Sequence, residues 1–137
     1  MVILLIVLDD QALLIRKPGA TPGRFSLPAG FVEPGETIED AVRREIKEGT
    51  GIDVGDIGYI GSQPWPFPGN LMIGCIGVAE TAEIKPNPET IESAQWISRA
   101  KVQVILEGKH PRMTLPGSDA LARAILIDWS NGDVAAP

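Results

Sequence analysis

The sequence predicts an α/β domain in which a mixed β-sheet is packed between helices, an α/β/α sandwich. Three observations predict it: aliphatic runs of strand length open the chain and recur after residue 50, an amphipathic acidic segment lies between them, and a second helical pattern comes near the end. At 137 residues, with 44% hydrophobic and 22% charged residues, residues 1–137 have the size and composition of one globular domain.

The N-terminal segment predicts a β-hairpin followed by a loop. Val2–Leu8 and Ala12–Arg16 are aliphatic runs separated by two aspartates and a glutamine. Residues 17–23 are rich in Pro, Gly and Thr and predict a loop. We expect a short strand at Phe25–Leu27, which Pro28 ends. Further strands are expected at Gly58–Gly61, Leu71–Glu80 and Ala94–Ile97.

Local signals predict where the helices begin and end. A central helix should begin near Thr37 as N-cap, with Asp40 in its first turn, and end by Gly51 as the left-handed residue. We expect a short helical turn at Val102–Glu107. A final helix, Asp119–Ser130 with Ser118 as its cap, has apolar residues at helical spacing: Leu121, Ala124, Ile125 and Trp129.

The central helix predicts a cation site. At about 100° per residue, Glu45 shares the apolar face that must pack on the sheet, and Glu48 lies at its edge. Arg44 should point away from that face, so it should not neutralise Glu45. A buried carboxylate without a partner is costly, and Mg²⁺ with its preference for oxygen ligands would satisfy it. The alternative for the scattered glutamates alone is a solvated acidic helix.

Residues 62–68, Ser-Gln-Pro-Trp-Pro-Phe-Pro, predict a binding segment. Alternating prolines remove backbone donors, which excludes a central strand and favours a stiff extended loop. Trp65 and Phe67 could then stack on a purine or nicotinamide ring, while Gln63 and Asn70 offer amide hydrogen bonds. The alternative is a structural loop whose aromatic rings fill the core or a dimer interface.

Composition excludes several classes of function. The net charge of −6 argues against a broad basic surface for nucleic acid. The apolar start is too short for a membrane span and has no basic segment before it. The single cysteine, Cys75, predicts a reducing, cytoplasmic location and a buried strand position. The single histidine, His110, is expected in a surface loop.

Residues 30–52 resemble the Nudix box, G-x5-E-x7-R-E-U-x-E-E-x-G-U, in which U is aliphatic. This resemblance implies the Nudix fold over nearly the whole chain and a Mg²⁺-dependent hydrolase that cuts a diphosphate joined to a nucleoside. The segment Ser-Gln-Pro-Trp-Pro-Phe-Pro-x-Asn at 62–70 is similar to the mark of the NADH diphosphatase branch. The C-terminal Leu-Pro-Gly-Ser stretch at 115–118 also looks like that branch.

The branch implies a substrate, partners and cofactors. Its members hydrolyse NADH and NAD⁺ to a nicotinamide mononucleotide and AMP, some remove NAD caps from RNA, and they work as dimers with Mg²⁺ or Mn²⁺. A dinucleotide is therefore the expected substrate, nucleic acid is expected only as NAD-capped RNA, and a homodimer stays open. The N-terminal domain and four-cysteine zinc ribbon usual in the family are not expected here.

Residue roles carry over by position. The resemblance implies that Glu45 and Glu48 hold the metal with the Ala29 carbonyl and that Arg44 orients the glutamates. We expect one of the two glutamates, with Glu45 favoured, to help deprotonate water. The resemblance also implies that the dinucleotide is bound by a second set of residues: Gln63, Trp65, Phe67, Asn70 and Ala122.

Two departures from the family pattern bear on catalysis. Gly49 replaces the second glutamate of the box, on the inward side of the helix, and Ser93 replaces a glutamate expected just before Ala-x-Trp. Glu92 could replace the second loss only if a bulge turned it inward. Three hypotheses stay open: a hydrolase of NADH-like dinucleotides with weakened activity, a hydrolase of another nucleoside diphosphate derivative, and a binding module without turnover.

Overall fold

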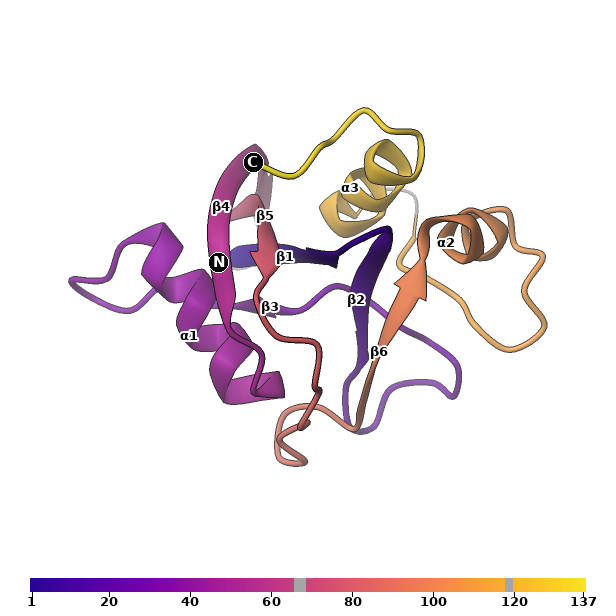
Figure 1. The fold of residues 1–137 in the computed structure, drawn as a ribbon, viewed down its shortest axis with the longest axis horizontal. Coiled ribbons are helices and arrows are strands. Elements are labelled where there is room, and N and C mark those ends of the chain that lie inside the picture. The colour runs from indigo at the N-terminus through magenta and orange to yellow at the C-terminus, as the bar shows by residue number, and fades with distance from the viewer. Residues whose placement is uncertain (66–68, 118–119) are drawn as a thin grey trace.

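The computed structural model describes residues 1–65, 69–117 and 120–137, and a mixed β-sheet lies at its centre (Figure 1). Along the chain the elements are β1 (Val2–Leu8), β2 (Gln11–Arg16), β3 (Ala29–Gly30), α1 (Ile38–Thr50), β4 (Val54–Trp65), β5 (Asn70–Ala79), β6 (Ser93–Ser98), α2 (Arg99–Leu106) and α3 (Leu121–Ser130). The strand order is β4-β5-β1-β2-β6, with β3 paired to β1 outside this path. β1 and β5 are parallel, and the other pairs are antiparallel.

Strand β1 changes partner along its length. Its first residues pair with β3, where Ile3 lies opposite Ala29, and its last residues pair with β2, where Val7 lies opposite Ala12. β2 and β3 therefore lie on the same side of β1, and the chain between them returns from Arg16 to Ala29. This change of partner places Ala29 and Gly30, two residues of the candidate site, beside the start of β1.

Helices cover both faces of the sheet, which confirms the α/β/α sandwich. α1 packs against one face, and α2 and α3 gather on the other (Figure 1). The strand residues alternate accordingly: Leu4 of β1 faces the α1 side and Leu5 faces the other core, and both are fully buried. None of the helices in the described residues is long and apolar enough to cross a membrane.

Helix α1 begins and ends as its sequence predicts. The Thr37 hydroxyl accepts a hydrogen bond from the Asp40 N–H at 3.1 Å, and Gly51 has φ 74° and donates to the Lys47 carbonyl. The helix continues through Gly49 and Thr50, both buried. Gly49 is therefore a helical residue that faces the protein interior and not part of the helix exit.

The prediction of an extended loop for residues 62–68 is wrong for its first half. Residues 62–65 continue β4, with Pro64 opposite Leu71 and Trp65 opposite Asn70 in β5. β4 is an edge strand, and an edge position tolerates a proline that a central strand would not. Residues 66–68 lie outside the described part.

Three other element predictions need correction. Residues 25–27 form no strand; Ser26 makes only an isolated bridge to Ile15, and the strand β3 lies after Pro28. The expected helical turn is the two-turn helix α2. α3 begins at Leu121 after Ala120, and residues 118 and 119, the predicted cap and first residue, are outside the described range.

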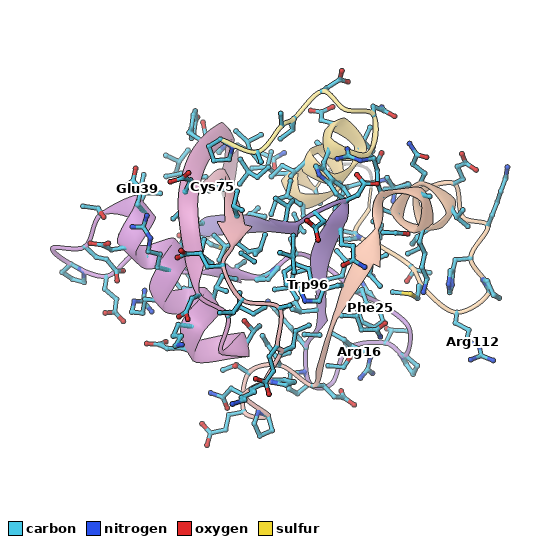
Figure 2. All side chains as sticks on the ribbon, in the orientation of Figure 1. Arg16, Phe25, Glu39, Cys75, Trp96 and Arg112 are labelled. Carbon is cyan, nitrogen blue, oxygen red and sulfur yellow. The ribbon has the colours of Figure 1, made fainter. Side chains whose placement is uncertain are left out.

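Cys75 lies in β5 with 2% of its surface exposed, as its strand position predicts. Burial raises the pKa of its thiol, with a smaller contribution from the charge of Glu39 (Figure 2). This cysteine therefore packs as a small apolar residue.

Candidate active site

Arg44, in the middle of α1, joins the helix to the loop before it. Its Nε and Nη2 donate to the two carboxylate oxygens of Glu36 at 2.7 and 2.9 Å, and Nη2 also donates to the Phe31 carbonyl at 2.9 Å. This two-point contact is the geometry in which a guanidinium binds a carboxylate most specifically. Arg44 therefore fixes residues 31–36 against the helix.

The same guanidinium also contacts the predicted metal ligands. Arg44 Nη1 donates to Glu45 Oε1 at 2.9 Å and lies 3.5 Å from Glu48 Oε2 and 3.6 Å from Glu33 Oε1. We refer to Glu33, Glu36, Arg44, Glu45 and Glu48 as the Arg44 cluster. With four carboxylates around one guanidinium, the cluster is anionic.

These contacts correct the prediction that Arg44 points away and cannot neutralise Glu45. The 100° rule gives the direction in which a side chain leaves the helix, but an arginine is long enough to curve back across its neighbour. Only 20% of the Arg44 side chain is exposed, compared with 26% for Glu45.

Protonation states in the cluster follow from these hydrogen bonds. The hydrogen bond from Arg44, then that from the Glu33 N–H, holds the pKa of Glu36 below its ordinary value. The hydrogen bond to Glu36 in turn raises the pKa of Arg44, and burial opposes this. The Glu36–Arg44 pair is therefore ionised at neutral pH.

Glu45 occupies space that a side chain at position 30 would fill. A Cβ atom added to Gly30 would lie 2.2 Å from the Glu45 carboxyl carbon and 2.4 Å from its Oε2. Glycine at this position of β3 thus allows the carboxylate to lie directly against the strand. One oxygen of Glu45 faces Arg44 and the other faces Gly30.

A cavity of about 350 Å³ opens beside Glu45 and Glu48. We call it the carboxylate cavity. Its other lining residues include Lys17, Ala29, Gly49, Asn87, Thr90 and Ile91. The structure thus brings together the three residues predicted to hold metal: Ala29, Glu45 and Glu48.

The donor set of this cavity fits a Mg²⁺- or Mn²⁺-type cation with few protein ligands. Glu45 and Glu48 supply carboxylate oxygens, and Gly30 leaves room for the first of them. In the described residues, no three His, Cys, Asp or Glu side chains come together as a metal site. A cation here would therefore depend on two carboxylates, the Ala29 carbonyl, water and substrate phosphate, a coordination that Mg²⁺ commonly accepts.

A second, mainly apolar cavity of about 250 Å³ shares two lining residues with the first, Lys17 and Ala29. We call it the apolar cavity. Met72 and Leu121 line it together with two predicted substrate-binding residues, Gln63 and Ala122. A polar site and an apolar site side by side suit a ligand with a charged group next to a ring.

Of the other predicted substrate-binding side chains, the structure describes only that of Asn70. Asn70 is half-buried at the start of β5 and lines neither cavity. Phe67 and the side chain of Trp65 lie outside the described part of the chain.

Gly49 lies against Ile91, and among the described residues no carboxylate takes the place of the expected one there. A Cβ atom added to Gly49 would lie 3.0 Å from Ile91 Cδ1, and the Gly49 carbonyl accepts a hydrogen bond from the Asn87 N–H at 2.8 Å. We call Gly49, Asn87, Thr90 and Ile91 the Gly49 flank. Asn87, Thr90 and Ile91 were not predicted from the sequence, because only the tertiary structure places them beside α1.

At Ser93, too, no carboxylate of the described residues takes the place of the expected glutamate. Ser93 begins β6 opposite Arg16 and does not line the carboxylate cavity. The Glu92 carboxylate is exposed and forms an ion pair with Arg16, so it does not replace the missing ligand.

His110 belongs to a loop away from these cavities, as its sequence context predicts. Its Nδ1 accepts hydrogen bonds from the N–H groups of Arg112 and Met113 at 3.1 and 2.9 Å. Figure 2 shows Arg112 at the outer edge of the molecule. This histidine therefore shapes its own loop.

The chain is similar to known proteins in both sequence and structure. A family model described as NUDIX domain matches residues 1–116. The human NAD-capped RNA hydrolase NUDT12 is 46% identical over 120 residues, covering 87% of this chain and 26% of that protein. The NAD-capped RNA hydrolase NudC of Pseudomonas aeruginosa (strain LESB58) is 47% identical over 96 residues, covering 70% of this chain and 34% of that protein.

The chain thus spans about a quarter to a third of the length of these relatives. Solved structures share its fold. A NUDIX-family hydrolase from Clostridium perfringens aligns with a TM-score of 0.69 at 17% identity, over 95% of this chain and 92% of that one. The MutT protein from Bacillus halodurans aligns with a TM-score of 0.68 at 25% identity, over 96% and 82%.

Proposed function

The chain belongs to the NUDIX domain family, and from this premise we propose that it hydrolyses the diphosphate of a nucleoside diphosphate-linked substrate, with an NAD-like dinucleotide as the leading candidate. One observation carries the proposal: the carboxylate cavity and the apolar cavity are neighbours that share Lys17 and Ala29 in their linings. A dinucleotide has the matching construction, with an anionic diphosphate next to a ring system. The relatives named as NAD-capped RNA hydrolases support this substrate class.

Each group has a role in this proposal. Arg44 holds Glu45 and Glu48 in position, and Glu45 accepts a proton from the attacking water. Gln63 and Ala122 bind one nucleoside in the apolar cavity. The water oxygen bonds to one phosphorus as the bridging P–O bond breaks, which gives two mononucleotides from a dinucleotide.

Mg²⁺ or Mn²⁺ would be held by Glu45, Glu48 and the Ala29 carbonyl. When bound, such an ion polarises phosphate oxygens and lowers the pKa of water. With Gly49 and Ser93 in place of glutamates, we expect weaker binding of the ion and slower turnover than a full ligand set would give.

The direct test incubates the protein with NADH and Mg²⁺ or Mn²⁺ and measures AMP and the reduced nicotinamide mononucleotide by chromatography. Product formation that rises with protein concentration and stops with a chelator supports the proposal. NAD-capped RNA and ADP-ribose serve as parallel substrates. No product from any of them, at any protein concentration, contradicts the proposal.

A second candidate function is nucleotide binding without turnover. The Gly49 flank favours it, because Ile91 and not a carboxylate lies next to Gly49. Calorimetry separates the two functions: micromolar binding of NADH or ADP-ribose without hydrolysis supports the binding module, and absence of binding excludes it. A homodimer and a cytoplasmic location stay predictions, which sedimentation and cell fractionation would test.

A further inference from the structure

Lys17 borders both the carboxylate cavity and the apolar cavity. It follows β2 directly, and Ala29 lines both cavities as well. Within the described residues it is the only cationic side chain that lines either one. A ligand that extends from one cavity into the other would pass this lysine.

The neighbouring arginines are already engaged, whereas Lys17 is not. Arg16 forms an ion pair with Glu92, and Arg44 is surrounded by the glutamates of its cluster. The Lys17 ammonium has no hydrogen bond or ion pair among the residues that the structure describes, and its side chain is exposed. Its charge is therefore available to a ligand.

The backbone at Lys17 is held in place although the ammonium is free. The Lys17 carbonyl accepts a hydrogen bond from the Ala20 N–H at 3.2 Å, and Arg16 Nη2 donates to the Ala20 carbonyl at 2.6 Å. Figure 2 shows Arg16 near the end of β2 that enters this loop. Arg16 thus fixes the turn from which the Lys17 side chain extends.

We infer that Lys17 binds the diphosphate of the substrate at the junction of the two cavities, an inference that rests on the proposed function. A diphosphate between two nucleosides carries two negative charges, and the nearby Arg44 cluster is anionic. A lysine ammonium, as a compact charge on a flexible stem, suits phosphate oxygens and offsets this repulsion. The ligand class is a nucleoside diphosphate derivative, and Lys17 contributes to its affinity and not to selection of its base.

The test compares Lys17→Ala and Lys17→Arg with the matched control Lys101→Ala. Lys101 is likewise exposed and without an ion pair in the described residues, but it lines a cavity that neither Lys17 nor Ala29 touches. Calorimetry measures Kd for ADP-ribose and for adenosine, which lacks phosphate, and NADH hydrolysis gives KM and kcat. Melting temperature verifies that each variant is folded.

Lys17→Ala should weaken ADP-ribose binding and raise KM for NADH by about tenfold, equivalent to about 1.4 kcal/mol. Adenosine binding should not change, Lys17→Arg should restore most of the affinity, and Lys101→Ala should resemble the unmodified protein. If Lys17→Ala binds ADP-ribose and hydrolyses NADH like an active unmodified protein, the inference is overturned and the proposed function stands. If the unmodified protein neither binds nor hydrolyses these probes, both fail.

Discussion

The two sides of Glu45 are built in different ways. On one side, Arg44 joins α1 to the preceding loop through four contacts of 3.6 Å or less, two to Glu36 and one each to Glu33 and the Phe31 carbonyl. On the other, the Gly49 flank has backbone hydrogen bonds and the Ile91 side chain but no carboxylate. The comparison teaches that the residues of the box that fold the loop and the residues expected to bind a cation are separable, and that this chain keeps the first set more completely.

The largest effect on activity is expected from substitution of Glu45, which lies between the Arg44 cluster and the Gly49 flank. Glu45→Gln keeps the size of the side chain but removes its charge, so NADH hydrolysis should fall by about a thousandfold, equivalent to about 4 kcal/mol in the barrier. Steady-state kinetics measures it. The control is Glu39→Gln, an exposed position on the same helix without a hydrogen bond to Arg44. Equal losses in both variants would contradict a special role for Glu45.

Restoring a carboxylate on the Gly49 flank should have the next largest effect. Because a Cβ atom at position 49 would lie 3.0 Å from Ile91 Cδ1, Gly49→Glu needs that side chain to move. We expect the double variant Gly49→Glu, Ile91→Val to raise kcat about tenfold or more, and the single variant to gain less.

The matched control for that experiment is Gly49→Ala with Ile91→Val. It has the same packing change and the same gain in helix propensity without a carboxylate. A control that equals the glutamate variant in kcat would attribute the gain to packing. If neither variant raises kcat, the slow turnover would be attributed to the absence of a glutamate at Ser93.

A smaller effect, on stability, should come from a substitution in the Arg44 cluster. Arg44→Lys cannot make the two-point contact with Glu36 and also reach the Phe31 carbonyl, so the melting temperature should fall by about 5 °C. Arg24→Lys is the control, since the Arg24 side chain is exposed and has no bond in the described residues. An unchanged melting temperature in Arg44→Lys would show that the cluster does not stabilise the loop.

The smallest expected effect is the pH dependence of the Glu36–Arg44 pair. Because Arg44 lowers the pKa of Glu36 in the folded state, the pair stabilises the fold above the ordinary glutamate pKa of about 4.3. This stabilisation is lost as the pH falls through the lowered folded-state value. Denaturant titrations from pH 7 to pH 3 should therefore show a steeper loss of stability in the unmodified protein than in Glu36→Gln. Parallel curves would contradict this linkage.

Features determined by neighbouring residues in the chain could be predicted from the sequence. β1, β2 and both ends of α1 follow from aliphatic runs, the Thr37 cap and the left-handed Gly51, all of which depend on local geometry. Features determined by distant residues could not. Pro64 is compatible with a strand only because β4 is at the sheet edge, and this depends on pairing with β5.

The site shows the same division. Glu45, Glu48 and Ala29 were predicted as a group from the family resemblance, and they do line one cavity. The hydrogen bond from Arg44 to Glu45 was not predicted, because a helical projection gives the direction of each side chain but takes no account of its length. The contact of Ile91 with Gly49 could not be predicted because it joins segments more than forty residues apart. The position of Lys17 could not be predicted either, because the two cavities that it borders are formed by the tertiary structure.

The guanidinium of Arg44 has a consequence for how such a domain can change over time. Because a permanent internal cation already satisfies Glu36 and one oxygen of Glu45, the fold should not depend on a divalent ion for its assembly. A chain of this kind can lose or regain an ion ligand without first passing through an unfolded form. Stability and catalytic rate can then change independently under mutation. Such a fold is therefore suited to the engineering of new sets of metal ligands.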